Sequence, residues 1–157
     1  MIKIPNLENI KAVSIPLRDF NKEVYKLIGQ DAERVGITTQ QLIVLFEVAN
    51  NPLGGLEQLS ETMQLSASTL SGIVDRLVKT ELLVRERSER DRRHLELRIS
   101  PAGGERVREA FNPETSVFLQ RMSFALQLPE EDLQTMMRVQ RQMLARIRGE
   151  DETTPSK

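Results

Sequence analysis

The chain has 157 residues, of which 39% are hydrophobic and 29% are charged, and its formal net charge is −1 at pH 7. This length and this proportion of hydrophobic to charged residues are typical of one folded domain with a hydrophobic core and exclude a disordered or collagen-like chain. The near-neutral net charge does not exclude nucleic-acid binding, since a local basic patch is enough for it. With no cysteine and one histidine in the sequence, we expect no disulfide, no thiol chemistry, no metal site and no cofactor.

The sequence predicts neither a targeting segment nor a membrane span. Residues 1–20 lack the basic start and continuous apolar stretch of a signal peptide, and no apolar run approaches the length of a bilayer-spanning helix. We therefore expect a cytoplasmic protein with no membrane partner.

Two helices are predicted in the first 51 residues. Residues 1–13 show no clear periodicity and are interpreted as an arm, whereas a helical apolar period begins at Pro16 and ends before Gly36, a candidate left-handed cap. The next helix is predicted to begin at Thr38, whose side chain can form a capping box with Gln41. Its expected buried stripe consists of Leu42, Leu45, Phe46 and Ala49.

Two short helices follow, separated only by Gln64 and Leu65. The second has Ser66 as its predicted N-cap. So short a turn favours two helices that cross steeply, as in a helix-turn-helix, and the small Ser60 would allow their close approach. The expected core residues of the pair are Leu56, Leu59, Met63, Leu65, Leu70, Ile73, Val74 and Leu77.

A β-hairpin is predicted next, because the apolar period changes from about 3.6 residues to about 2. Its strands are expected at 84–87 and 94–99, around a polar, highly charged tip at 88–93. Five arginines and three acidic residues lie between Arg85 and Arg93. The hairpin is therefore a candidate wing beside the helix-turn-helix.

The remainder is predicted to be helical. Ser100 and Pro101 are favourable at the start of a long helix, in which Pro113 is expected to produce a kink. Pro129 opens a last helix, whose first turn carries acidic residues against the positive end of the helix dipole. The order of elements predicts a mainly α fold, a winged helix-turn-helix with long N- and C-terminal helices.

The outward face of the second short helix is predicted to contact DNA. Small residues let a helix enter the major groove, about 12 Å wide, and hydroxyls can meet base edges or phosphates. Arginines on a protruding hairpin suit the minor groove and its phosphates. The candidate contacts are Ser66, Ser68, Thr69, Ser71, Gly72 and Arg76 in the helix, and Arg87, Arg90, Arg92 and Arg93 in the wing.

Asp75 is out of place on this face, because a carboxylate repels phosphate. We hypothesise that Asp75 pairs with a wing arginine or with Arg76 and holds that side chain in position.

The stretch from Gly55 to Gly103 resembles the core signature of MarR (multiple antibiotic resistance regulator) family proteins. The resemblance is carried by "STLSGIVDRL" in the second short helix, "VRERSERDRR" in the wing and "ISPAG" at the start of the next helix, with "ITTQQLIVL" before them. A helix-turn-helix alone is a weak signal, whereas this wing pattern after it is fairly specific.

The resemblance implies a single domain over residues 1–157 that forms a homodimer on a pseudo-palindromic operator. Dimerisation helices at 14–36 and 101–148 would flank a DNA-binding core at 37–100, with a tail at 149–157. Ser66, Ser68, Thr69, Ser71 and Arg76 would contact the major groove, Arg93 the minor groove, Asp91 would orient Arg93, and Arg90 would lie near the wing tip.

The resemblance also implies a ligand-responsive regulator, acting as a repressor, whose effector is a small aromatic or anionic compound. The aromatic residues available for that pocket are Phe20, Tyr25 and Phe46. Two positions depart from the family pattern: Gln64 and Glu81 stand where glycine is common, so the helix cap at Glu81 is expected to differ.

Two other classes of function stay open on the residues alone. A winged helix can be a protein–protein interaction module without sequence-specific DNA binding, and the polar helix face and the wing can be ordinary solvated surfaces. An enzyme is not expected, because the sequence has no paired-carboxylate motif, no glycine-rich phosphate loop and no cysteine.

Overall fold

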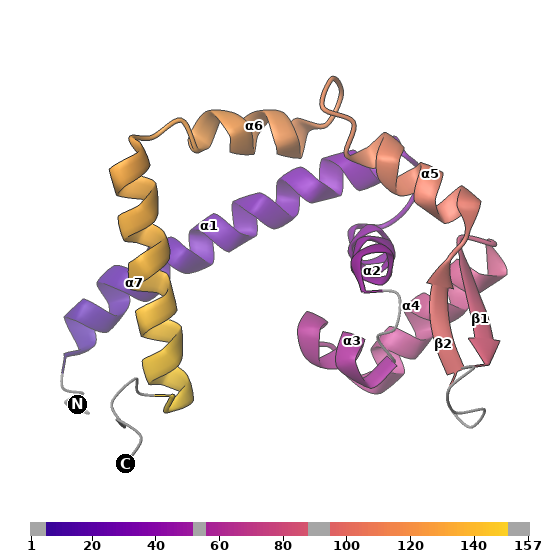
Figure 1. The fold of residues 1–157 in the computed structure, drawn as a ribbon, viewed down its shortest axis with the longest axis horizontal. Helices are drawn as coiled ribbons and strands as arrows, with labels where there is room; N and C mark the ends of the chain where they lie inside the picture. The colour runs from indigo at the N-terminus through magenta and orange to yellow at the C-terminus, as the bar shows by residue number, and fades with distance from the viewer. Residues whose placement is uncertain (1–5, 52–55, 88–94, 151–157) are drawn as a thin grey trace, which may run out of the picture. The chain divides into compact units, whose positions relative to one another are not determined.

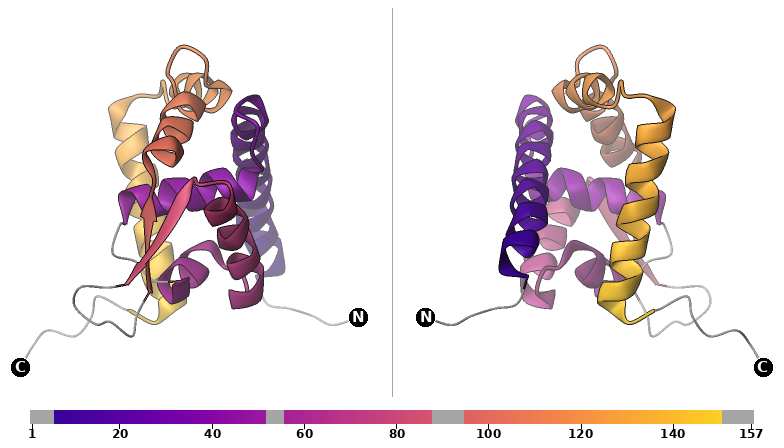
Figure 2. Two further views of the ribbon diagram at one scale, coloured as in Figure 1. Left: turned by 90° about the vertical axis from the view of Figure 1, so that its right-hand side faces the viewer. Right: turned by 90° about the vertical axis from the view of Figure 1, so that its left-hand side faces the viewer.

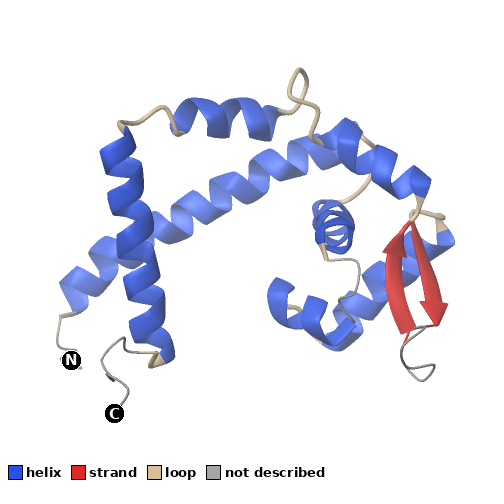
Figure 3. Cartoon of the chain, in the orientation of Figure 1, coloured by secondary structure: helices blue, strands red, loops and turns tan. Residues whose placement is uncertain are grey.

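The computed structural model describes residues 6–51, 56–87 and 95–150, which form seven helices and one antiparallel pair of strands (Figures 1 and 3). The elements are α1 (Leu7–Arg34), α2 (Thr39–Asn50), α3 (Leu56–Met63), α4 (Ala67–Lys79), β1 (Leu83–Arg87), β2 (Leu95–Ile99), α5 (Pro101–Ala110), α6 (Val117–Ala125) and α7 (Glu130–Arg148). None of these helices is long and apolar enough to cross a membrane. The chain divides after Gln120 into two compact units.

The first unit is organised around α2, which contacts α1, α4, α5 and β2. The helix is seen end-on in Figure 1 and from the side in Figure 2, with α5 on one side of it and α3 and α4 on the other. The main hydrophobic core of this unit lies between α2, the helix-turn-helix (α3 and α4) and the base of the wing (β1 and β2). The buried members of this core are Val44, Leu45, Val48, Leu59, Leu70, Ile73, Val74, Leu77, Leu82, Leu83 and Leu97.

Helix α1 begins at Leu7, so the prediction of an arm was wrong for residues 7–13, whereas residues 1–5 lie outside the described residues. Pro16 suggested a helix start because proline is favoured in the first turn, but here it lies inside α1. The helix continues through this proline, which lacks the N–H of one backbone hydrogen bond. The other end is as predicted: Gly36 has φ +75° and terminates the helix.

The capping box of α2 is confirmed. The backbone N–H of Gln41 donates to Thr38 Oγ1 at 3.2 Å, and the backbone N–H of Thr38 donates to Gln41 Oε1 at 2.9 Å. The predicted stripe is only half correct: Leu42 and Leu45 are buried, but Phe46 and Ala49 are exposed. Because α2 has neighbours on several sides, Val44 and Val48 are buried instead.

Helices α3 and α4 both end in a left-handed residue that is not glycine. Gln64 has φ +52° and Glu81 has φ +59°. After α4, the N–H of Leu82 donates to Leu77 O at 2.9 Å, the hydrogen bond of a Schellman cap. The expectation of a different cap at Glu81 was therefore wrong: the backbone keeps the glycine-type geometry, although it costs roughly 1–2 kcal/mol for a residue with a Cβ.

The predicted long helix with a kink at Pro113 was also wrong, because the chain breaks there into α5 and α6. The N–H of Glu114 donates to Asn112 Oδ1 at 2.9 Å, and the N–H of Ser116 donates to Asn112 O at 2.7 Å. Ser116 then caps α6, its Oγ accepting from the N–H of Leu119 at 3.1 Å. These turn bonds replace the helical pattern over residues 112–116.

The break is held by a fully buried carboxylate, Asp31 of α1. Its oxygens accept hydrogen bonds from Ser116 Oγ at 2.7 Å, Val117 N at 2.9 Å and Phe118 N at 3.0 Å. One turn on, Arg34 donates to the carbonyl of Ala110 at 2.9 Å, at the end of α5. Asp31 therefore occupies the positive N-terminal end of α6.

The second unit contains most of α6 and all of α7. Helix α7 begins after Pro129, as predicted, with acidic residues in its first turn, and it ends at left-handed Gly149. None of its residues is buried. Large apolar side chains are exposed on this unit: Phe124, Leu126, Leu128, Met136, Met137, Val139, Leu144 and Ile147.

Candidate nucleic-acid interface

A cluster of hydroxyl groups lies at the start of α4. Ser66 is the N-cap, as predicted, and its Oγ accepts a hydrogen bond from the N–H of Thr69 at 3.2 Å. The same oxygen lies 3.1 Å from Ser68 Oγ and 2.7 Å from Thr69 Oγ1. All three residues are exposed, so this end of α4 presents hydroxyls beside the positive pole of the helix.

The two faces of α4 divide as the sequence predicts. Leu70, Ile73, Val74 and Leu77 are buried in the core. Ser71 and Gly72 are half-buried, whereas Asp75, Arg76 and Lys79 are exposed. Among the described residues, Arg76 and Lys79 have no carboxylate partner. The outer face of α4 therefore changes from small and hydroxyl-bearing at its start to basic at its end.

The wing packs against α4 through the base of its strands. Leu83 pairs with Ile99, and Arg85 with Leu97, in the antiparallel register; Leu83 and Leu97 are buried. On the exposed side Arg98 forms a 3.0 Å ion pair with Glu86. Of the predicted wing contacts, Arg87 ends β1, and Arg90, Asp91, Arg92 and Arg93 lie outside the described residues.

Asp75 pairs with a wing arginine, as the sequence analysis hypothesised. Arg85 Nη2 lies 2.5 Å from Asp75 Oδ1, and 32% of the Arg85 side chain and 57% of the Asp75 side chain are exposed. The pair joins the outer face of α4 to strand β1. Asp75 is therefore a strut between the two parts of the interface, and its charge is neutralised locally.

We expect this strut to contribute a small, measurable coupling to stability. In a double-mutant cycle with Asp75→Asn and Arg85→Gln, followed by urea unfolding, the coupling should be about 0.2–1 kcal/mol, the range of partly exposed ion pairs. The cycle of Asp75→Asn with Arg76→Gln is the matched control and should give a coupling near zero. Equal couplings in the two cycles would contradict the strut.

The predicted effector residues are not brought together as one aromatic group. Phe46 contacts Phe111 edge-to-face at 5.4 Å between ring centres, and Phe111 contacts Phe118 at 6.0 Å. Phe20 and Tyr25 lie on α1, each about half exposed, and take no part in these two contacts. The sequence pattern does not predict the contact of Phe46 with Phe111, because that contact depends on the break between α5 and α6.

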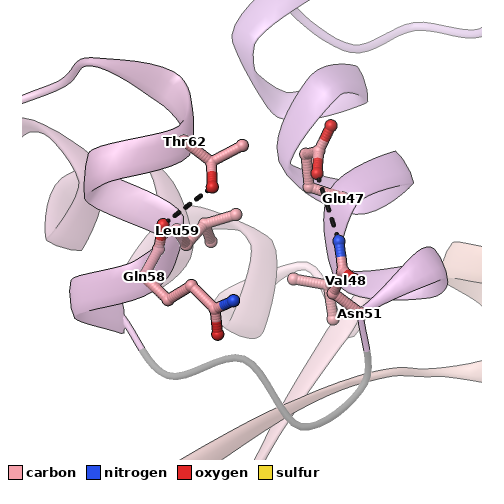
Figure 4. A pocket seen from close by; sticks show the side chains of 6 residues that line it. All are labelled: Glu47, Val48, Asn51, Gln58, Leu59 and Thr62. Carbon is pink, nitrogen blue, oxygen red and sulfur yellow. Dashed lines mark hydrogen bonds between the residues drawn. The ribbon is translucent and has the colours of Figure 1, made fainter. Parts of the chain in front are cut away.

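A small hollow lies between the end of α2 and α3 (Figure 4). Asn51 Nδ2 points toward Glu47 Oε2, 3.5 Å away, and Thr62 Oγ1 donates to Gln58 O at 2.9 Å. The hollow also borders Val48 and Leu59, and its volume is about 20 Å³. That space holds about one water molecule and is too small for an organic effector.

Comparison with known proteins points to one family. Residues 35–94 match a family model described as the MarR family. The transcriptional repressor MdtR of Bacillus subtilis (strain 168) is 22% identical over 121 residues, 77% of this chain and 76% of that protein. The regulator SarZ of Staphylococcus aureus (strain USA300) is 28% identical over 83 residues, 53% of this chain and 56% of SarZ.

Solved structures agree on the fold. A mutant of MarR from E. coli, complexed with operator DNA, superposes with a TM-score of 0.71 at 16% identity, over 91% of this chain and 99% of that chain. The MepR–DNA complex of S. aureus gives a TM-score of 0.68 at 23% identity, over 85% of this chain and 96% of that chain. The predicted fold class, a mainly helical winged helix-turn-helix with long terminal helices, is confirmed.

Proposed function

We propose that this chain, whose residues 35–94 match the MarR family model, is a winged helix-turn-helix transcriptional regulator of that family, a sequence-specific repressor and not an enzyme. It acts as a cytoplasmic homodimer on a pseudo-palindromic operator and responds to a small effector. The outer face of α4 carries the proposal: hydroxyls at its start, Arg76 and Lys79 near its end, and the Asp75–Arg85 strut to the wing.

The hydroxyl-bearing start and the basic end of this face would contribute differently to DNA binding. Ser68 and Thr69 offer hydroxyls to base edges in the major groove, which supplies discrimination between sequences. Arg76 neutralises phosphate, which supplies affinity that falls steeply as salt is added. Two copies of α4 in a dimer would read half-sites about one helical turn apart.

A second copy of the chain is the partner that the exposed apolar residues favour. Ile10, Val13, Ile15, Leu17 and Phe20 on α1 are more than two-fifths exposed, and the second unit carries its own exposed apolar set. Contiguous exposed apolar surface on a soluble protein marks an interaction site. The exposed set of the second unit and the residues Ile15, Leu17 and Phe20 lie within the dimerisation helices that the family resemblance implies, at 14–36 and 101–148, whereas Ile10 and Val13 precede the first of them.

The effector is proposed to be a small aromatic or anionic compound. Phe46, 43% exposed, and its contact with Phe111 offer an aromatic wall; Phe20 and Tyr25 stay in the proposal as exposed aromatic residues of α1. Such a compound releases the operator only if it binds the DNA-competent and the released conformations with unequal affinity. Benzoate is a suitable first probe in the binding assay below.

Selection of duplexes from a random pool tests the function directly. A repressor of this kind should enrich a pseudo-palindromic duplex. Its affinity for that duplex should fall steeply between about 50 and 200 mM salt, because a protein that makes about 6–10 phosphate contacts loses about 10³–10⁵-fold in affinity over this range. A purified protein that is indifferent to every duplex at low salt would instead support the alternative, a winged-helix module that docks on another protein.

Arg93 is proposed to be the wing contact to the minor groove, with Arg87, Arg90 and Arg92 on nearby phosphates and Asp91 orienting Arg93. Arg93→Ala should weaken operator binding about tenfold or more, since one specific arginine contact contributes about 1–3 kcal/mol. Fluorescence anisotropy on the selected duplex measures the loss, and sedimentation should find the oligomeric state unchanged.

Arg108→Ala is the matched control for this prediction. It removes the same charge from an exposed arginine on α5, which pairs with Glu105. Operator affinity should stay within about twofold of wild type. Wild-type affinity in Arg93→Ala would remove the wing from the proposed interface.

A further inference from the structure

Gly72 occupies the middle of α4, where glycine weakens a helix. Relative to alanine, glycine in a helix interior is unfavourable by roughly 0.5–1 kcal/mol, because it loses more backbone freedom on folding. The backbone does not require glycine there: the glycines with positive φ among the described residues are Gly36 and Gly149. Backbone conformation therefore gives no reason for a glycine at position 72.

Packing gives no reason for it either. Outside the backbone of α4 itself, a Cβ built on Gly72 meets no atom of the described residues within 4 Å. By contrast, a Cβ on Gly103 would lie 2.1 Å from the carbonyl oxygen of Leu82, so that glycine is required by the fold. At position 72 alanine would strengthen the helix and fit into open space, so the folded chain alone favours alanine over the residue that is present.

The position lies at the centre of the outer face of α4. Gly72 is one turn after Ser68 and one turn before Arg76, so the three share a line along the helix. Its open space therefore faces the same side as the hydroxyls and the basic residues. A contact that forms only when a partner arrives would explain a glycine that the isolated chain does not need.

We propose that Gly72 is a specificity-determining residue of the DNA interface; this rests on the proposed function. The missing Cβ lets the backbone of α4 lie directly against base edges in the major groove. A methyl group or anything larger at this position holds the helix away from the bases, while the arginines still reach phosphates. Discrimination between sequences is then lost before general affinity for DNA.

The test compares Gly72→Ala and Gly72→Leu with wild type, on the selected duplex and on a scrambled duplex of equal length. Gly72→Ala should raise the melting temperature by about 1–4 °C, since each kcal/mol of added stability shifts the melting temperature of a chain of this length by about 2–4 °C. It should weaken binding to the selected duplex about tenfold and leave binding to the scrambled duplex within about twofold. Gly72→Leu should lose more specific binding than Gly72→Ala.

Gly104→Ala is the matched control, because Gly104 also lies in a helix interior and its Cβ would make only an ordinary 3.7 Å contact with Arg108 Nη1. It should raise the melting temperature and leave both DNA affinities unchanged. Unchanged specific binding in Gly72→Ala, or a lowered melting temperature, would overturn the inference. If wild type itself fails to select a duplex, the proposed function fails first, and this inference falls with it.

Discussion

Replacing Asp31 with alanine should destabilise the fold by about 3–5 kcal/mol, the cost of removing one member of a buried charged cluster. The carboxylate is fully buried and accepts hydrogen bonds from Ser116, Val117 and Phe118. Alanine leaves a buried hydroxyl and two helix N–H groups without an acceptor, and it leaves Arg34 without its carboxylate partner. Each unsatisfied buried donor costs roughly 1–3 kcal/mol.

Urea unfolding followed by circular dichroism measures this loss. Asp31→Asn should be less damaging than Asp31→Ala, because the amide retains one acceptor oxygen for the start of α6. Asp19→Ala is the matched control: Asp19 is an exposed aspartate on the same helix, paired with Arg18, and its loss should be within about 0.5 kcal/mol. An Asp31→Ala midpoint equal to that of Asp19→Ala would contradict the role of Asp31 at the break.

Gly103→Ala should cost about 3 kcal/mol, at the upper end of the usual penalty for overpacking. The added Cβ would lie 2.1 Å from Leu82 O and 2.9 Å from the side chain of Ile99. Neither neighbour can move easily: Leu82 O accepts the N–H of Ser100 at 3.2 Å, and Ser100 Oγ donates to Glu81 O at 2.7 Å. The close approach of α5 to the end of α4 therefore depends on the missing side chain.

The adjacent glycine again supplies the control. Gly104→Ala, measured in the same urea titration, should be neutral or slightly stabilising. The difference between two neighbouring, chemically identical substitutions isolates the steric contact from the gain in helix propensity. A Gly103→Ala protein as stable as Gly104→Ala would show that α5 can move away from Leu82 without cost.

Elements with local signals could be predicted from the sequence. The capping box of Thr38 and Gln41 and the N-cap at Ser66 are set by residues three positions apart, and the wing follows from an alternating pattern. The Asp75 strut could be predicted for a different reason, because a carboxylate on a face that is predicted to contact DNA needs a cationic partner. In the two caps and in the strut, the residues that interact are at most about ten positions apart in the sequence.

Features that depend on distant partners could not be predicted. The break between α5 and α6 is held by Asp31, which is 85 positions from Ser116, and nothing near Asp31 in the sequence signals burial. Gly103 lies in the ISPAG motif, but the fold requires glycine there because the carbonyl of Leu82, 21 positions earlier, leaves no space for a Cβ. The only sequence signal for the effector residues is their aromatic character, and the contact of Phe46 with Phe111 depends on where α5 ends.

The exposed apolar residues of α1 and of the second unit have a consequence for stability if the proposed homodimer forms. If a second copy covers these faces in the folded state, folding and assembly form one equilibrium, and mass action applies to both. A tenfold dilution then corresponds to about 1.4 kcal/mol of association free energy. Under that condition, the copy number in the cell would set the fraction of subunits that are folded.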